Sequence, residues 1–204
     1  QDVSTTEDGS YALNGAMTEA ELLAVTRNGD ATWVIPTEDE WYKAAYYDPT
    51  TDNYYEYATS SDTTPSNALT DPDPGNNATF YGGPGVGDTI GAPYWRTEVG
   101  AHENSDSPYG TFDQTGNVWE YTETLVDNAG DTEAVRRGGS FWHSAGALPA
   151  SVRASWDREL DNGYTGFRLA NLSPAAGPVP EPASIGLLGL GLAGVVVARR
   201  RRKA

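Results

Sequence analysis

The sequence predicts an α+β domain with little regular secondary structure, followed by an apolar C-terminal span. Gly, Pro, Asn, Asp, Ser and Thr recur in runs that break helical and strand periodicity, which favours loops. A capping box at 37–40 predicts one short helix, and several short aromatic or β-branched segments bounded by glycine predict short strands. At 204 residues, the chain allows one ordinary domain plus appendages.

The N-terminal region alternates turns with short apolar pieces. Residues 7–10 and 27–30 contain Asp-Gly and Asn-Gly turns, and residues 31–35 form an apolar run that ends at Pro36. Between the two turns, residues 18–23 fit either a short helix or a solvated connection, and the sequence leaves both open.

The capping box predicts a helix over residues 38–47. The Thr37 hydroxyl can accept from the N–H of Glu40 while the Glu40 carboxylate reaches back, and acidic residues suit the positive end of a helix. Trp41 begins an apolar face at i, i+3 and i+4, so it is predicted to anchor the core.

Residues 50–110 are dominated by turn formers. So long an irregular stretch is uncommon in a compact domain, and it indicates either disorder or loops held by something else, such as bound ions. The segments predicted to be short strands of a curved sheet follow this stretch: 109–113, 116–121, 137–141 and 166–170.

The C-terminal span predicts a transmembrane helix. After a Pro/Ala/Gly linker at 173–178, residues 183–198 are uncharged and mostly apolar. As a helix they extend roughly 24 Å, at the short end for crossing a ~30 Å hydrocarbon core. The basic cluster that follows is expected to stay in the cytoplasm, which places the acidic domain outside.

The rest of the chain is strongly acidic. The net charge is −16, from 13 Lys and Arg against 29 Asp and Glu, and five of the cations lie at 199–203. The remainder therefore carries eight cations against 29 acids, or −21. Such a charge repels nucleic acid, so no nucleic-acid partner is expected, and it attracts divalent cations.

Residues 179–204 resemble the PEP-CTERM sorting signal. The resemblance implies recognition by an exosortase, a transient anchor in the inner membrane, cleavage near the motif and release to the cell surface or exterior. Because the chain starts at Gln1 without a leader, we expect that residues are missing upstream. The signal comprises Val179, Pro180, Glu181, Pro182, Arg199, Arg200, Arg201 and Arg202.

Residues 1–172 resemble the formylglycine-generating enzyme, or sulfatase-modifying factor, family. The resemblance implies an irregular variant of the C-type lectin fold whose usual N-terminal part is missing here. It rests on five motifs in the family's order: Ile-Pro-Thr-Glu-Asp-Glu-Trp at 35–41, Tyr-Gly-Thr-Phe-Asp at 109–113, Gly-Asn-Val-Trp-Glu at 116–120, Arg-Gly-Gly-Ser at 137–140 and Gly-Phe-Arg at 166–168.

The resemblance also bears on catalysis. Enzymes of the family oxidise a substrate cysteine with copper and dioxygen, using two cysteines shortly after the Gly-Gly-Ser segment. This chain has no cysteine, and His143 and Leu148 stand at those two positions. Soft thiolates select Cu(I), and these side chains do not replace them, so copper is not expected. His143 itself has two possible roles. It is either a functional residue, as a metal ligand or general base, or a hydrogen-bonded structural residue.

The resemblance implies calcium as the cofactor. One family calcium maps onto the side chains of Asp113 and Glu120 with carbonyls from Gly116 and Val118, and hard oxygen ligands of this kind suit Ca²⁺. The alternative is that the two acids are ordinary turn and strand residues. A second calcium, across a loop of altered length, maps onto Asn77, Ala78, Asp88 and Ile90.

Other residues favour structural roles. Trp119, Trp142, Phe167 and Tyr109 are predicted core aromatics, although an exposed subset would form a surface on which a glycan or peptide stacks. Arg153 and Arg168 are expected to pair with acids, and the glycines at 138–139 to permit a bulge or close backbone approach.

The leading hypothesis is an exported, non-oxidase binding module stabilised by calcium, whose ligand is an extracellular protein or glycan. The alternative is an oxidoreductase that uses residues outside the missing cysteine pair.

Overall fold

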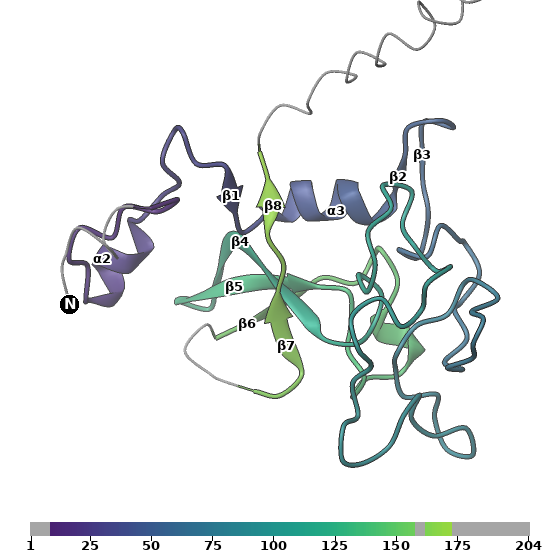
Figure 1. Cartoon of the computed structure of the whole chain (residues 1–204). Coiled ribbons are helices and arrows are strands. Elements are labelled where there is room, and N and C mark those ends of the chain that lie inside the picture. Colours follow the sequence, from purple (N-terminus) through teal and green to yellow (C-terminus); the bar gives the residue numbers. More distant parts are fainter. Residues whose placement is uncertain (1–8, 158–161, 173–204) are drawn as a thin grey trace, which may run out of the picture. The chain divides into compact units, whose positions relative to one another are not determined.

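The computed structural model describes residues 9–157 and 162–172 (Figure 1). The chain divides into two compact units, 1–170 and 171–204. The linker at 173–178, the sorting signal and the predicted transmembrane helix at 183–198 lie outside the described residues. In the part that is described, no helix is long and apolar enough to cross a membrane.

The described residues form few helices and mostly short strands, which confirms the prediction of a loop-rich domain. The helices are α2 (Glu19–Leu23), α3 (Glu38–Tyr46) and the 3₁₀ helix η1 (Ala145–Ala147). The strands are β1 (Trp33–Val34), β2 (Tyr47–Asp48), β3 (Asn53–Tyr54), β4 (Trp119–Asn128), β5 (Asp131–Arg137), β6 (Ala154–Trp156), β7 (Thr165–Phe167) and β8 (Ala170–Asn171).

A four-stranded sheet in the order β6-β5-β4-β7 forms the centre of the first unit. β4 and β5 form an antiparallel hairpin, β6 extends it antiparallel to β5, and β7 lies parallel to β4. The hairpin turns at Ala129 and Gly130, which both have positive φ. In the register of the sheet, Glu120 lies opposite Gly166 on one side and Arg137 on the other.

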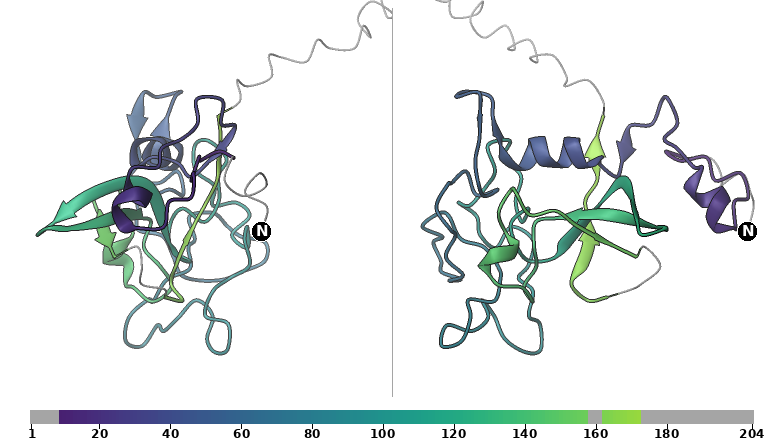
Figure 2. Two further views of the ribbon diagram at one scale, coloured as in Figure 1. Left: turned by 90° about the vertical axis from the view of Figure 1, so that its left-hand side faces the viewer. Right: turned by 180° about the vertical axis from the view of Figure 1, so that it is seen from behind.

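Helix α3 packs against β4 and β5, as two views show (Figure 2). Its predicted capping box is present, with Thr37 accepting from the Glu40 N–H and the Glu40 carboxylate accepting from the Thr37 N–H. Trp41 is only 1% exposed, which confirms it as a core anchor. The open question about residues 18–23 is also answered, because Thr18 and Glu21 form a second capping box at the start of α2.

The predicted strands differ from the structure in their extent. Residues 109–113 form a loop, and of the predicted strand at 137–141 only Arg137 belongs to a strand, as the end of β5. Strand β4 begins at Trp119 rather than at residue 116, and β7 ends at Phe167 rather than at residue 170. After Arg137, the chain leaves the sheet because Gly138 and Gly139 both have positive φ. A Cβ on Gly138 would lie 2.7 Å from the Gln114 carbonyl oxygen, so the close backbone approach predicted for these glycines is confirmed.

Buried hydrogen bonds hold the long irregular region between β3 and β4. Asp73 is 3% exposed, and its carboxylate accepts from the side chains of Asn77 and Ser105 and from the backbone N–H groups of Gly75 and Asn104. Burial alone would raise the pKa of Asp73, but these donors lower it to about 2. The loop at 71–77 is thereby fastened to the loop at 102–105.

Asp73→Asn is expected to lower the free energy of unfolding by about 2 kcal/mol at pH 7. The depressed pKa means that this contribution is present above about pH 4, the unfolded value, and is lost as the pH falls through about 2. Urea unfolding of both proteins between pH 7 and pH 2 measures it, with the exposed Asp71→Asn as control on the same loop. A difference that does not shrink in acid would contradict the prediction.

Candidate functional site

Glu120, a predicted calcium ligand, is buried at the start of β4 with 6% of its surface exposed. Its Oε2 accepts from the Trp41 indole N–H at 2.6 Å and from Nε of Arg168, and its Oε1 accepts from Nη2 of Arg168 at 2.6 Å. The predicted pairing of Arg168 with an acid is confirmed. Because both oxygens of Glu120 are occupied, an ion bound there must compete with the guanidinium.

The other members of this set lie in the loop that leads into β4. Asp113 has φ +61°, and its Oδ2 accepts from the Gly100 N–H at 2.7 Å. Gly116 pairs with Thr79, and Val118 packs close to Gly166 of β7. Arg168 also donates to the carbonyl of Phe112, so its guanidinium links Glu120 to the residue next to Asp113.

The second predicted set lies on two segments that run side by side. Tyr81 pairs with Asp88, and the Thr89 hydroxyl donates to the carbonyl of Ala78 at 3.4 Å. Asn77 is 3% exposed and donates its amide N–H to Asp73. Ile90 lies one residue beyond Thr89. Hard oxygens from two adjacent segments are compatible with Ca²⁺.

Both sets are rich in carbonyl oxygens. Within residues 9–157 and 162–172, no three or more His, Cys, Asp or Glu side chains gather as a metal-binding group.

His143 stands at the first thiol position and has defined partners. Its Nδ1 lies 3.2 Å from the Trp119 indole N–H and 2.7 Å from the Ser140 hydroxyl. Because an indole N–H can only donate, Nδ1 must accept, and the proton of the neutral ring sits on Nε2. Burial and then the nearby charge of Arg136 lower the pKa of His143. These contacts favour the structural interpretation of this residue.

Leu148 stands at the second thiol position and is fully buried. It belongs to a core cluster with Tyr57, Ala78 and Phe80. A side chain on Gly139 would collide with Leu148 at 2.7 Å. Of the two positions at which the resemblance implies thiols, one is thus held by a hydrogen-bonded histidine and the other by a leucine packed in the core.

Arg136 is a buried residue of this region that the sequence did not single out. Its guanidinium is sandwiched among the rings of Trp119, Trp156 and Tyr164, with centroids 5.1, 4.6 and 5.9 Å from Cζ. Burial lowers its pKa. A pair of arginines before Gly-Gly carries no local signal of this arrangement, because the three rings come from three other segments.

The predicted aromatic core is only partly present. Trp119 is 3% exposed, as predicted, and Arg153 pairs with Glu38 as predicted. Trp142, Phe167 and Tyr109 are 65%, 64% and 47% exposed, so their prediction as core residues is wrong. Phe167 ends β7, an edge strand of the sheet, and Tyr109 and Trp142 lie in turns.

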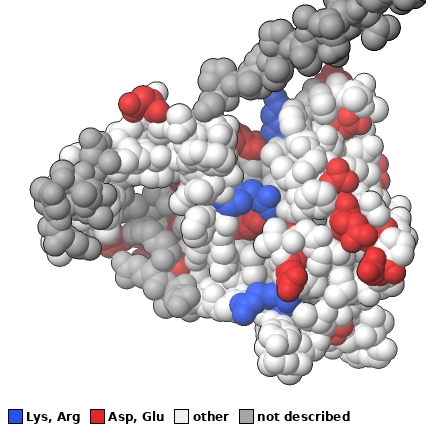
Figure 3. Space-filling model, in the orientation of Figure 1, with Lys and Arg blue, Asp and Glu red and all other residues white. Residues whose placement is uncertain are grey.

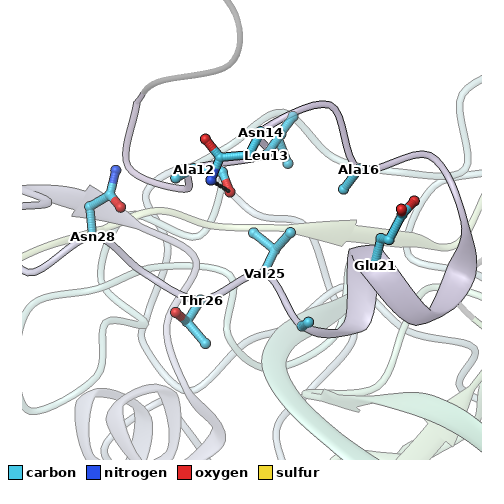
Figure 4. Close-up of a pocket in the computed structure, with 9 residues that line it drawn as sticks. Ala12, Leu13, Asn14, Ala16, Glu21, Val25, Thr26 and Asn28 are labelled. Carbon is cyan, nitrogen blue, oxygen red and sulfur yellow. Dashed lines mark hydrogen bonds between the residues drawn. The ribbon is translucent and has the colours of Figure 1, made fainter.

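The face of the molecule in Figure 3 displays more acidic than basic side chains. A hollow of about 400 Å³ lies in the N-terminal region, and Figure 4 shows its lining. Two of its polar groups serve local structure, since Asn14 donates to the Ala12 carbonyl and Glu21 caps α2. A second hollow, of about 560 Å³, lies between the loops around residues 69 and 90–101.

Comparison with known proteins places these features in a family. Residues 4–172 match the sulfatase-modifying factor enzyme 1-like domain, and residues 178–202 match the PEP-CTERM protein-sorting motif. This motif implies export and exosortase-mediated sorting. No curated protein matches the chain.

Two solved structures are similar to the chain. Treponema denticola variable protein 1 aligns with a TM-score of 0.50 and 22% identity over 76% of this chain, and the structure titled CarF aligns with 0.49 and 18% over 76%. The chain spans 53% of each of those proteins. The family match covers most of the chain, and the chain therefore belongs to the sulfatase-modifying factor enzyme 1-like domain family.

Proposed function

We propose that this protein is an exported binding module of its family and not an oxidase. The observation that carries the proposal is the state of the two thiol positions, where the ring nitrogen of His143 is hydrogen-bonded and Leu148 is fully buried. The exposed rings of Trp142, Phe167 and Tyr109 support a surface on which an extracellular protein or glycan stacks. We also propose that the domain is an irregular variant of the C-type lectin fold.

The oxidase test uses the purified full chain and a peptide that contains Cys-x-Pro-x-Arg. With copper and dioxygen supplied, mass spectrometry is expected to find the cysteine unchanged, because no thiol is available to hold Cu(I). Conversion of the cysteine to formylglycine would overturn the proposal and favour the oxidoreductase alternative.

Calcium is the proposed structural ion. The second set, with side-chain oxygens of Asn77 and Asp88 and carbonyls of Ala78 and Ile90, supports this proposal better than the first. In the first set, the Asp113 side chain and the carbonyls of Gly116 and Val118 would supply oxygens to the ion. The carboxylate of Glu120, however, is already paired with Arg168. Bound calcium would supply positive charge to loops that carry an excess of acids and would cross-link two segments.

Calcium at a hundredfold excess over Kd is expected to raise Tm by about 5–10 °C relative to EDTA, because it binds only the folded loops. Thermal unfolding of the wild type, Asp88→Asn and Asp71→Asn measures this. Asp88→Asn should lose the shift, whereas Asp71→Asn, an exposed acid outside both sets, should keep it. A wild-type Tm that is the same in calcium and EDTA would count against the ion.

A further inference from the structure

The second hollow has the size and lining of a ligand pocket. Its volume of about 560 Å³ falls within the roughly 300–1,000 Å³ of small-molecule sites. Leu69 and Tyr94 remain 45% and 72% exposed there. The lining is mostly apolar and contains three polar residues, Arg96, Thr97 and Glu98.

Arg96 is the one cationic residue among those that line the pocket. Its guanidinium lies 5.7 Å from the centroid of Phe141, and Nη1 donates to the Gly163 carbonyl, so the group is held in place. In the described part of the chain no carboxylate forms an ion pair with it. The other described arginines differ, because Arg136 is buried and the remainder pair with glutamates: Arg27, Arg137, Arg153 and Arg168.

Glu98 adds an acceptor to the same lining. A planar guanidinium binds a carboxylate through paired N–H groups, and a carboxylate accepts an amide N–H. Apolar surface beside these groups suits an apolar side chain. A carboxylate, an amide N–H and an apolar side chain occur together in an N-acylated apolar amino acid.

We propose that this pocket binds an N-acylated apolar amino acid through its carboxylate, which Arg96 holds. The chemistry is shared by a free acyl amino acid and by the C-terminal residue of a peptide. This inference rests on the proposed binding function and gives that function a ligand class. The proposed ligand would contact side chains of the pocket, whereas calcium would bind the backbone carbonyl oxygen of Ile90.

The test compares N-acetyl-L-tryptophan with its neutral amide, N-acetyl-L-tryptophanamide, by isothermal titration or ligand-observed NMR on the full chain. The acid is expected to bind at least about tenfold more tightly, because only the acid forms charge-assisted hydrogen bonds. Arg96→Gln should remove this preference. Lys43→Gln, which removes an exposed cation over Tyr47 away from the pocket, should retain it.

Equal affinity of the wild type for the acid and the amide, or no saturable binding of either, would overturn the proposal. An unchanged Tm of Arg96→Gln shows that its loss of preference is local. A peptide with C-terminal tryptophan that binds more tightly than the acetyl amino acid supports a chain end, and equal affinities support a free acid. Failure here leaves the oxidase test unaffected, so the two proposals fail separately.

Discussion

Arg168→Ala is expected to lower the free energy of unfolding by about 3–5 kcal/mol. The substitution leaves Glu120, 6% exposed, with a buried charge whose remaining side-chain donor among the described residues is the neutral indole N–H of Trp41. Breaking a buried pair by removing one partner costs far more than the pair itself contributes, because the remaining ion has lost its hydration. The same change frees the Phe112 carbonyl.

Urea unfolding at pH 7 measures this loss, with Arg153→Ala as the matched control. Arg153 also pairs with a glutamate, but its side chain is 43% exposed and Glu38 keeps Arg137 as a partner. The control should therefore cost no more than about 1 kcal/mol. The double variant Glu120→Gln/Arg168→Met should recover part of the loss, because no unpaired charge remains. An Arg168→Ala loss as small as that of the control would contradict the prediction.

Local signals in the sequence predicted helix α3 well, whereas they left residues 18–23 open between a helix and a connection. The Thr37 capping box places α3 to within one residue at its end, and Trp41 is the core anchor that its spacing predicted. The strands were harder to predict because each glycine-bounded segment fits either an extended strand or an irregular turn. The hairpin between Thr122 and Arg136 was missed, since its alternating residues are mostly polar and its main signal is the turn at 129–130.

The candidate site depended on contacts that sequence spacing does not reveal. Glu120 fitted a calcium ligand locally, but its partner Arg168 lies 48 residues away and reaches it through the parallel pairing of β4 and β7. The resemblance identified His143 as the residue at the first thiol position, but the sequence did not reveal its hydrogen bond to Trp119, 24 residues away. Acidic composition suggested ions as the support of the long loops, and the structure adds a buried network around Asp73.

Gly116→Ala is expected to lower the free energy of unfolding by about 3–5 kcal/mol. Gly116 has φ +79°, and a Cβ there would lie 2.3 Å from the Thr79 carbonyl oxygen, which also accepts from the Asn117 N–H. Gly110→Ala is the matched control, because its φ is +71° with no atom within 4 Å of the added Cβ. The control should cost only the backbone strain, about 1–2 kcal/mol. The difference between the two variants in urea unfolding measures the close approach that joins the loop at 77–80 to the start of β4, and equal losses would show that this contact contributes nothing.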